Sequence, residues 1–277
     1  MNVDQEYAEQ DELPPATPAA TLVIFRHDAS GGPPQLLMVE RSATMRFAGG
    51  AAVFPGGRID PADFDLAREL SESAADEDAI DDLAARIAAV RETLEETGLV
   101  VGIDRAVSLD EALAARAFLL EQGALAPVLA RHGWTLVPHN LTYFARWRPK
   151  HTHMRVFDTR FFLADLGTGA VELAVDATEN THLFWASAAE ALKLADAGQI
   201  AVIFPTRRNL ERLAQFATVA KARADAHAHP VETITPWVEK LDGVAYLRIP
   251  EGLGYPITAE PMDSVTRGFG AAAFPPA

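Results

Sequence analysis

One stretch of this sequence, residues 80–97, constrains the fold more than any other. An apolar residue recurs there every three or four positions, which is the period of an amphipathic helix; the residues are Ile80, Leu83, Ile87, Val90 and Leu94. Gly98 follows directly, and glycine commonly ends a helix because it accepts the left-handed conformation. We therefore predict a long helix that packs one apolar stripe against a core.

The same helix carries three acids at its carboxyl end, Glu92, Glu95 and Glu96. Negative charge is unfavourable there because the helix dipole is negative at that end, and Glu92 and Glu96 repel each other one turn apart. At roughly 100° per residue the three acids fall on one side, nearly opposite the apolar stripe. A solvated acidic face is the common explanation for such a group, but no Lys or Arg follows at the next turn. A divalent cation held by the three carboxylates explains the arrangement better, because Mg²⁺ and Mn²⁺ prefer oxygen ligands.

Two adjacent glycines, Gly56 and Gly57, precede this helix in the segment FPGGRID and follow the apolar run 51–54. Adjacent glycines permit a tight turn and let backbone N–H groups approach an anion closely. By itself the pair indicates only a turn. Together with the acidic helix it indicates a phosphate-binding element.

Composition and charge exclude several classes of protein. The 277 residues contain no cysteine, which excludes disulfides, thiolate metal sites and cysteine nucleophiles. Most of the net charge of −15 comes from residues 1–20 and 59–82, and no basic stripe typical of a nucleic-acid-binding protein is present. The first residues do not resemble a signal peptide, and no apolar run is long enough to span a bilayer. We therefore expect a cytoplasmic protein that binds neither nucleic acid nor membrane.

Strand-like and helix-like segments alternate without an internal repeat, which predicts a mixed α/β domain with a helical addition. We expect a disordered acidic arm over 1–18, a catalytic domain over 19–230 and a Pro-rich extension over 231–277. Strands are predicted at 21–26, 35–41, 51–54, 140–148, 154–164 and 244–249. Helices are predicted at 80–97, 108–122, 187–197 and 206–226.

Gly57 and the segment Arg91-Glu92-x-x-Glu95-Glu96-x-Gly98-Leu99 resemble the signature of the Nudix hydrolases. These Mg²⁺- or Mn²⁺-dependent enzymes cleave the diphosphate linkage of nucleoside diphosphate derivatives. In the family signature five residues separate the glycine from a glutamate, and seven more precede the arginine. Here Gly57 and Arg91 lie 34 positions apart, so about 20 residues are inserted. Leu83 stands at the position of that glutamate, which is either absent or replaced by an acid from the insert.

A second resemblance points to one branch of this family. The segment Leu37–Ser42, followed by Phe54-Pro55-Gly56-Gly57 and Asp60, is similar to a block found in coenzyme A diphosphatases. The long insert resembles that of the acyl-coenzyme A diphosphatases, and the similarity extends over roughly residues 20–216. The resemblance implies a mixed β-sheet sandwiched by helices, with a C-terminal helical extension.

The resemblance also implies roles for the residues of the helix. Glu92, Glu95 and Glu96 are expected to bind the metal, and one of them or a further acid is expected to act as the general base. Arg91 is expected to pair with one of these carboxylates and orient it. The alternative for Arg91 is an ordinary surface pair with Glu95.

Substrate-binding residues are expected before the helix. Arg41 and Arg46 are candidates for phosphate binding, together with Gly56 and Gly57, because guanidinium groups bind phosphate in bidentate fashion. The alternative is that both arginines are solvated loop residues. Weaker candidates are the basic stretch 146–155 as a phosphate site, His151 and His153 as metal ligands, and Glu172 or Glu179 as a further metal-binding acid.

Three functions remain open from the sequence. The first is hydrolysis of coenzyme A or acyl-coenzyme A to 3′,5′-ADP and (acyl-)phosphopantetheine, and the second is the same chemistry on ADP-ribose or a reduced nicotinamide dinucleotide. The third is binding or regulation without turnover. Residues 60–78 hold eight acids and no strong apolar period, so we expect a flap over the site rather than part of the core. The sequence also leaves open whether the protein forms a homodimer.

Overall fold

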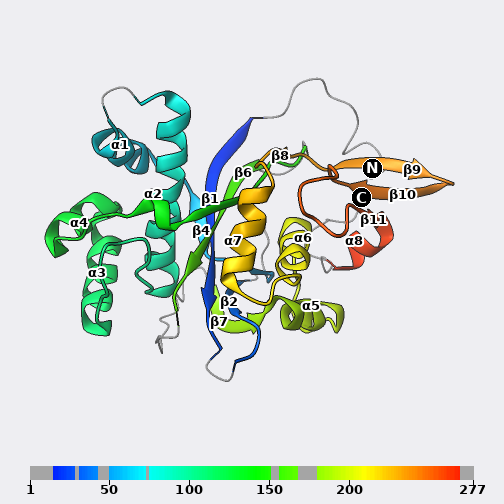
Figure 1. Cartoon of the computed structure of the whole chain (residues 1–277), viewed down its shortest axis with the longest axis horizontal. Coiled ribbons are helices and arrows are strands. Elements are labelled where there is room, and N and C mark those ends of the chain that lie inside the picture. The colour runs from blue at the N-terminus through cyan, green and yellow to red at the C-terminus, as the bar shows by residue number, and fades with distance from the viewer. Residues whose placement is uncertain are drawn as a thin grey trace.

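The structure is a computed structural model that describes residues 15–28, 31–42, 50–72, 75–150, 156–167 and 180–268. A mixed β-sheet forms its centre (Figure 1). Its strands are β1 (Ala16–Arg26), β2 (Gln35–Arg41), β3 (Ala52–Val53), β4 (Gly56–Arg58), β5 (Thr142–Trp147), β6 (Val156–Asp165), β7 (Asn180–Ser187) and β8 (Thr233–Ile234). The main path runs β3-β2-β1-β6-β5-β8, while β4 also pairs with β1 and β7 with β2.

Strand β1 lies in the middle of the sheet and contributes to both faces. It runs parallel to β6 over ten residue pairs and antiparallel to β2 and β4. Successive side chains of a strand point to opposite faces. Accordingly Leu22 and Ile24 belong to one hydrophobic core, whereas Val23 and Phe25 belong to a second core on the other face. Burial on both faces explains why this strand is an almost continuous apolar run.

Helices cover the two faces of the sheet (Figure 1). The first face carries α1 (Pro61–Leu70), α2 (Glu77–Thr97), α3 (Leu109–Gln122), α4 (Leu125–His132) and the short 3₁₀ helix η2 (Pro138–Asn140). The second carries α5 (Ala188–Asp196), α6 (Phe204–Leu213) and α7 (Val219–Ala228). This is the predicted fold class, a mixed sheet sandwiched by helices.

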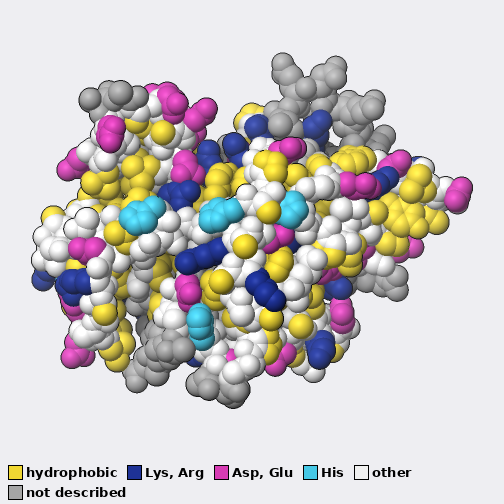
Figure 2. Space-filling model, in the orientation of Figure 1, with side chains coloured by type: hydrophobic (Ala, Val, Ile, Leu, Met, Phe, Trp, Pro, Cys, Tyr) yellow, Lys and Arg dark blue, Asp and Glu magenta, His cyan; other side chains and the backbone are white. Residues whose placement is uncertain are grey.

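The C-terminal segment is folded onto the second core. It forms a small sheet in the order β11-β10-β9, followed by a helix; the elements are β9 (Trp237–Leu241), β10 (Val244–Arg248), β11 (Ala259–Pro261) and α8 (Met262–Gly268). Tyr255, which precedes β11, donates a hydrogen bond of 2.8 Å to Asn209 of α6, and Trp147 of β5 donates to both. Residues 231–268 therefore complete the second core, and they add a small sheet and one helix, with exposed hydrophobic side chains on β9 and β10 (Figure 2).

Most predicted helices and strands are found, with three differences. The predicted helix 206–226 is two helices, α6 and α7, because Thr218 caps a new helix after a break at 214–217. Strand β1 begins at Ala16, so the end of the predicted acidic arm pairs with β6. Strands β4, β7, β8, β9 and β11 and helices α1, α4 and α8 were not predicted.

The expectation for the insert was wrong in its first half. Residues 61–70 form α1, whose Leu66 and Ala67 are buried in the first core against α2. The apolar period did not predict this helix, because its buried face contains few apolar residues and one acid, Asp63. In the part of the chain that the structure describes, no helix is long and apolar enough to cross a membrane.

Candidate active site

Helix α2 carries the acidic signature and is held firmly at both ends. The Asp76 side chain accepts a hydrogen bond from the Ala79 N–H at the amino end, and Gly98 ends the helix with a φ of 74°. The predicted stripe is buried, apart from Leu83, which is partly exposed. Alanines and threonines beside this stripe are buried too, so the second half of α2 is covered on most sides. Glu96 is therefore buried, at 6% exposed, whereas the side chains of Glu92 and Glu95 are 15% and 35% exposed.

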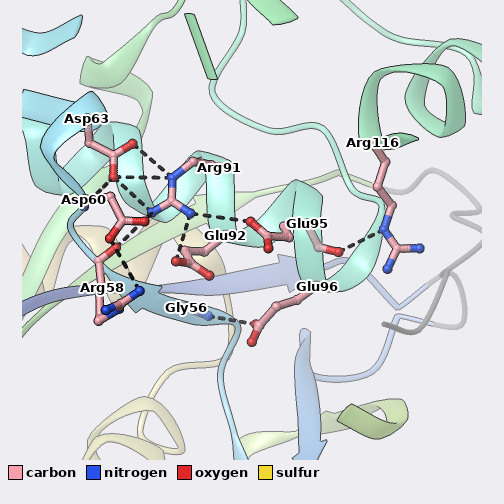
Figure 3. Close-up of polar contacts among 9 residues, drawn as sticks. All are labelled: Gly56, Arg58, Asp60, Asp63, Arg91, Glu92, Glu95, Glu96 and Arg116. Atoms are coloured by element: carbon pink, nitrogen blue, oxygen red, sulfur yellow. Dashed lines mark hydrogen bonds and ion pairs between the residues drawn. The ribbon is translucent and has the colours of Figure 1, made fainter. Parts of the chain in front are cut away.

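Strand β4 covers the acids of α2. The Gly56 N–H donates a hydrogen bond of 3.0 Å to Glu96 Oε2 (Figure 3). A Cβ atom at Gly57 would overlap the Glu92 carboxylate, and one at Gly56 would overlap the backbone of β1. Only glycine at position 56 allows β4 to lie this close to the backbone of β1, and a side chain at position 57 would displace the Glu92 carboxylate. The two glycines thus let β4 lie directly against Glu92 and Glu96.

Arg91 is the centre of the ionic contacts in the site. Its Nε lies 3.0 Å from Asp63 Oδ1, and its Nη2 lies 3.0 Å from Asp63 Oδ2 and 2.9 Å from the Arg58 carbonyl oxygen. Its Nη1 lies 3.0 Å from Glu92 Oε1 and 3.5 Å from Glu95 Oε2. Arg91 is 3% exposed, so it is not the surface residue of the alternative interpretation. The guanidinium contacts a carboxylate of the signature, which is the contact predicted for it.

Asp63 is the residue that the sequence interpretation missed. It lies at the start of α1, is 1% exposed, and also accepts a hydrogen bond of 2.9 Å from the Asp60 N–H. The sequence does contain a signal for Asp63, but it is found only when positions are counted from Gly57 and not from Arg91. Counted forward from Gly57, Asp63 stands where the family signature has its first glutamate, whereas counting back from Arg91 gave Leu83. The insert therefore follows Asp63, and an aspartate replaces the glutamate.

The electrostatics of the cluster follow from its burial. Burial raises the pKa of Glu92 to about 7; the nearby Arg91 opposes this, and the charge of Glu95 adds to it. Burial acts to lower the pKa of Arg91, but the hydrogen bond with Asp63 and the charge of Glu92 outweigh it and raise that pKa. Arg91 thus stays charged, while Glu92 of the metal-free protein titrates near neutral pH, and a bound cation would favour its ionised form.

The donors of the cluster suit a hard divalent cation, because all are carboxylate oxygens. Among the described residues, no three Asp, Glu or His side chains converge closely enough to enclose a metal ion. Glu92 faces Arg91 while Glu96 faces Gly56. A cation here would therefore need waters or substrate oxygens as further ligands, which is the usual coordination of Mg²⁺ in phosphate-binding sites.

The remaining predicted site residues lie in different places. Arg41 ends β2, where it pairs with Asn180 of β7 and its N–H donates a hydrogen bond of 3.0 Å to the Ala51 carbonyl oxygen. Arg146 makes a bidentate ion pair with Asp158, at 2.8 and 2.7 Å, and so has a structural partner. Arg46, His151, His153, Glu172 and Glu179 lie outside the described residues.

The fold and the acidic cluster define the class: a mixed α/β protein in which a glycine-containing strand packs on an acidic helix. Comparison with solved structures defines the family. No family model matches the sequence. The crystal structure of a Nudix hydrolase from Alicyclobacillus acidocaldarius is 30% identical, with a TM-score of 0.64 over 76% of this chain and 96% of that protein. The chain therefore belongs to the Nudix hydrolases and is an enzyme of that family. Nudix hydrolases generally use divalent metal ions.

Two other solved structures are less similar. A MutT/nudix family protein from Enterococcus faecalis is 16% identical, with a TM-score of 0.36 over 64% of this chain and 46% of that protein. The Nudix domain of NrtR from Shewanella oneidensis, solved with ADP ribose, is 14% identical, with a TM-score of 0.39 over 73% and 89% of the two chains. Both scores are low, so the family assignment depends on the first structure.

Proposed function

We propose that this enzyme hydrolyses the diphosphate linkage of coenzyme A or acyl-coenzyme A, giving 3′,5′-ADP and (acyl-)phosphopantetheine. One observation carries the hydrolytic part of the proposal. Strand β4 and helix α2 bring the Gly56 N–H, Glu92 and Glu96 together at one end of the sheet. The choice of coenzyme A rests on the resemblance of residues 37–60 and of the insert to that branch of the family.

Each residue of the cluster has a proposed part in this reaction. Glu92, Glu95 and Glu96 would hold Mg²⁺ or Mn²⁺ together with water or substrate oxygens, and the cation would supply positive charge against the diphosphate and the attacking water. Arg91, which is itself held by Asp63, fixes the orientation of Glu92. In the metal-free protein burial raises the pKa of Glu92 to about 7, and an acid with a pKa near neutral is suited to general-base catalysis where it is not itself a metal ligand. We leave open which acid of the cluster is the general base.

Arg41 and Arg46 are the proposed ligands of the 3′-phosphate of coenzyme A. The Arg41 Nε is buried and has no hydrogen-bond partner among the described residues. A buried donor without a partner is costly, and a phosphate oxygen would satisfy it. The Arg41 N–H is bonded to Ala51, which directly precedes β3, and β3 leads into β4; this connection supports the assignment.

The test compares coenzyme A with dephospho-coenzyme A, which lacks the 3′-phosphate, in the presence of Mn²⁺. We expect coenzyme A to be cleaved with the higher kcat/KM, because a charge-assisted hydrogen bond contributes about 1.5–3 kcal/mol, or one to two decades in rate. Arg41→Ala and Arg46→Ala should narrow this gap by slowing only the cleavage of coenzyme A. Arg146→Ala, which breaks the structural pair with Asp158, is the control and should keep the ratio of the two rates.

Other outcomes of this test would favour the alternatives. Equal rates on the two compounds would remove the case for coenzyme A. Faster cleavage of ADP-ribose or NADH in the same assay would replace it with a dinucleotide pyrophosphatase. Tight binding of these compounds without turnover at any Mn²⁺ concentration would contradict hydrolysis and favour a binding role.

A further inference from the structure

Arg58, the last residue of β4, places an exposed cation at the rim of the acidic cluster. Its side chain is 55% exposed, and its Nη2 lies 3.8 Å from Asp60 Oδ1 (Figure 3). The other oxygen of the same carboxylate, Asp60 Oδ2, lies 3.6 Å from Arg91 Nη2. One carboxylate therefore connects the exposed guanidinium of Arg58 with the buried guanidinium at the centre of the site.

The backbone at Arg58 is fixed although its side chain is exposed. The Arg58 carbonyl oxygen accepts the 2.9 Å hydrogen bond from Arg91, and the residue pairs with Ala19 of β1. The preceding residue, Gly57, lies directly against the Glu92 carboxylate. Arg58 thus extends from a rigid part of the site, which favours precise binding of a ligand.

The other arginines near the cluster are already engaged. Arg91 is buried among five acceptor groups. Arg116 of α3 is partly buried, and its Nε donates to the Glu95 carbonyl oxygen at 2.8 Å. Arg58 has only its long ion pair with Asp60 in the described part of the chain, and an exposed pair of this length contributes little. Its guanidinium remains available to a ligand from solvent.

The negative charge of the acidic cluster suggests a role for the Arg58 guanidinium. Arg91 contacts four carboxylates, those of Asp60, Asp63, Glu92 and Glu95, and Glu96 lies nearby against Gly56 (Figure 3). In the metal-free cluster these acids outnumber the arginines, so an approaching diphosphate meets net negative charge. A guanidinium at the rim reduces this repulsion and can grip two phosphate oxygens at once. We propose that Arg58 binds the diphosphate of the substrate and so determines its affinity. This inference rests on the proposed hydrolysis of a nucleoside diphosphate derivative.

A structural role for Arg58 makes different predictions. If the side chain only neutralised Asp60, Arg58→Ala would lower the melting temperature or change the affinity for Mn²⁺. If it binds phosphate, the variant should keep its melting temperature, bind Mn²⁺ at least as tightly, and bind the diphosphate more weakly. Binding is measured by calorimetry with α,β-methylene-ADP, a diphosphate whose bridging oxygen is replaced by CH₂ and which is not hydrolysed at that bond.

Arg58→Ala should raise the Kd for α,β-methylene-ADP and the KM for coenzyme A roughly tenfold to a hundredfold, with kcat within a few-fold of the native value. Arg58→Lys should recover part of this loss. The matched control is Arg68→Ala on α1, since Arg68 is 53% exposed and also pairs with one aspartate, Asp65. Unchanged Kd and KM in Arg58→Ala, in an enzyme that turns over normally, would overturn the inference and leave the proposed function standing. A native enzyme that neither binds nor hydrolyses these compounds would overturn both.

Discussion

The ion pair between Asp63 and Arg91 joins α1 to α2, and removing the negative charge of Asp63 tests that connection. Asp63→Asn preserves shape and keeps an oxygen that can accept from the Asp60 N–H. It leaves the buried Arg91 without its bidentate partner. We therefore expect both the stability of the fold and the orientation of Glu92 to suffer.

The magnitude follows from burial and from the contacts that remain. Breaking one side of a buried ion pair costs about 3–5 kcal/mol. Arg91 keeps the Arg58 carbonyl, Glu92 and Glu95, so we expect the lower end, about 3 kcal/mol. For a chain of this size that lowers Tm by roughly 6–12 °C. Loss of a group that orients a metal ligand typically costs tenfold to a hundredfold in activity, so kcat/KM with Mn²⁺ should fall by one to two decades.

Thermal unfolding followed by circular dichroism and steady-state kinetics measure the two effects. The control is Asp65→Ala, two residues away in the same helix, which breaks the exposed pair with Arg68 and should cost less than about 1 kcal/mol. A double-mutant cycle with Arg91→Met isolates the pair, and we expect a coupling energy of about 2–3 kcal/mol. The reasoning fails if Asp63→Asn behaves like Asp65→Ala, or if the coupling is near zero.

Three further predictions concern the acids and the C-terminal segment. Glu96→Gln should abolish hydrolysis but leave the metal-free protein at least as stable, because repulsion within the cluster is relieved and the amide oxygen can still accept from Gly56 N–H; unfolding of this variant, or native turnover, would contradict a metal-binding role. Because the pKa of Glu92 is raised in the folded state, the metal-free protein should lose stability as the pH rises from about 4.5 to 7, where the unfolded chain has released this proton and the folded protein still holds it. Mn²⁺ affinity should rise over the same pH range. Glu92→Gln should flatten both profiles, which denaturant titration and calorimetry measure. A chain ending at residue 230 should be unfolded by circular dichroism, because it lacks Tyr255 and the other core residues of that segment, and a native spectrum would show that the second core forms without them.

Local chemistry let the sequence determine the main elements. The period of the apolar residues and the terminal Gly98 predicted α2, and Ser108 and Ser187 predicted the starts of α3 and α5, because caps and periodicity act within a few residues. The three glutamates and the paired glycines likewise indicated the candidate site, where β4 contacts α2. Each of these signals depends on neighbours in the chain, so no tertiary contact was needed to recognise it.

The tertiary structure decided how these elements combine into a site. A side chain at position 57 would displace Glu92 because β4 lies against that carboxylate, and Arg91 is buried because α1 covers it. Asp63 lies 28 positions before Arg91, and no local pattern joins residues at that separation. The buried Asp63 also weakens the apolar pattern of α1, and for this reason the sequence predicts a flap where the structure has a packed helix. Its burial is stable because Arg91 neutralises it, and only the fold brings the two charges together.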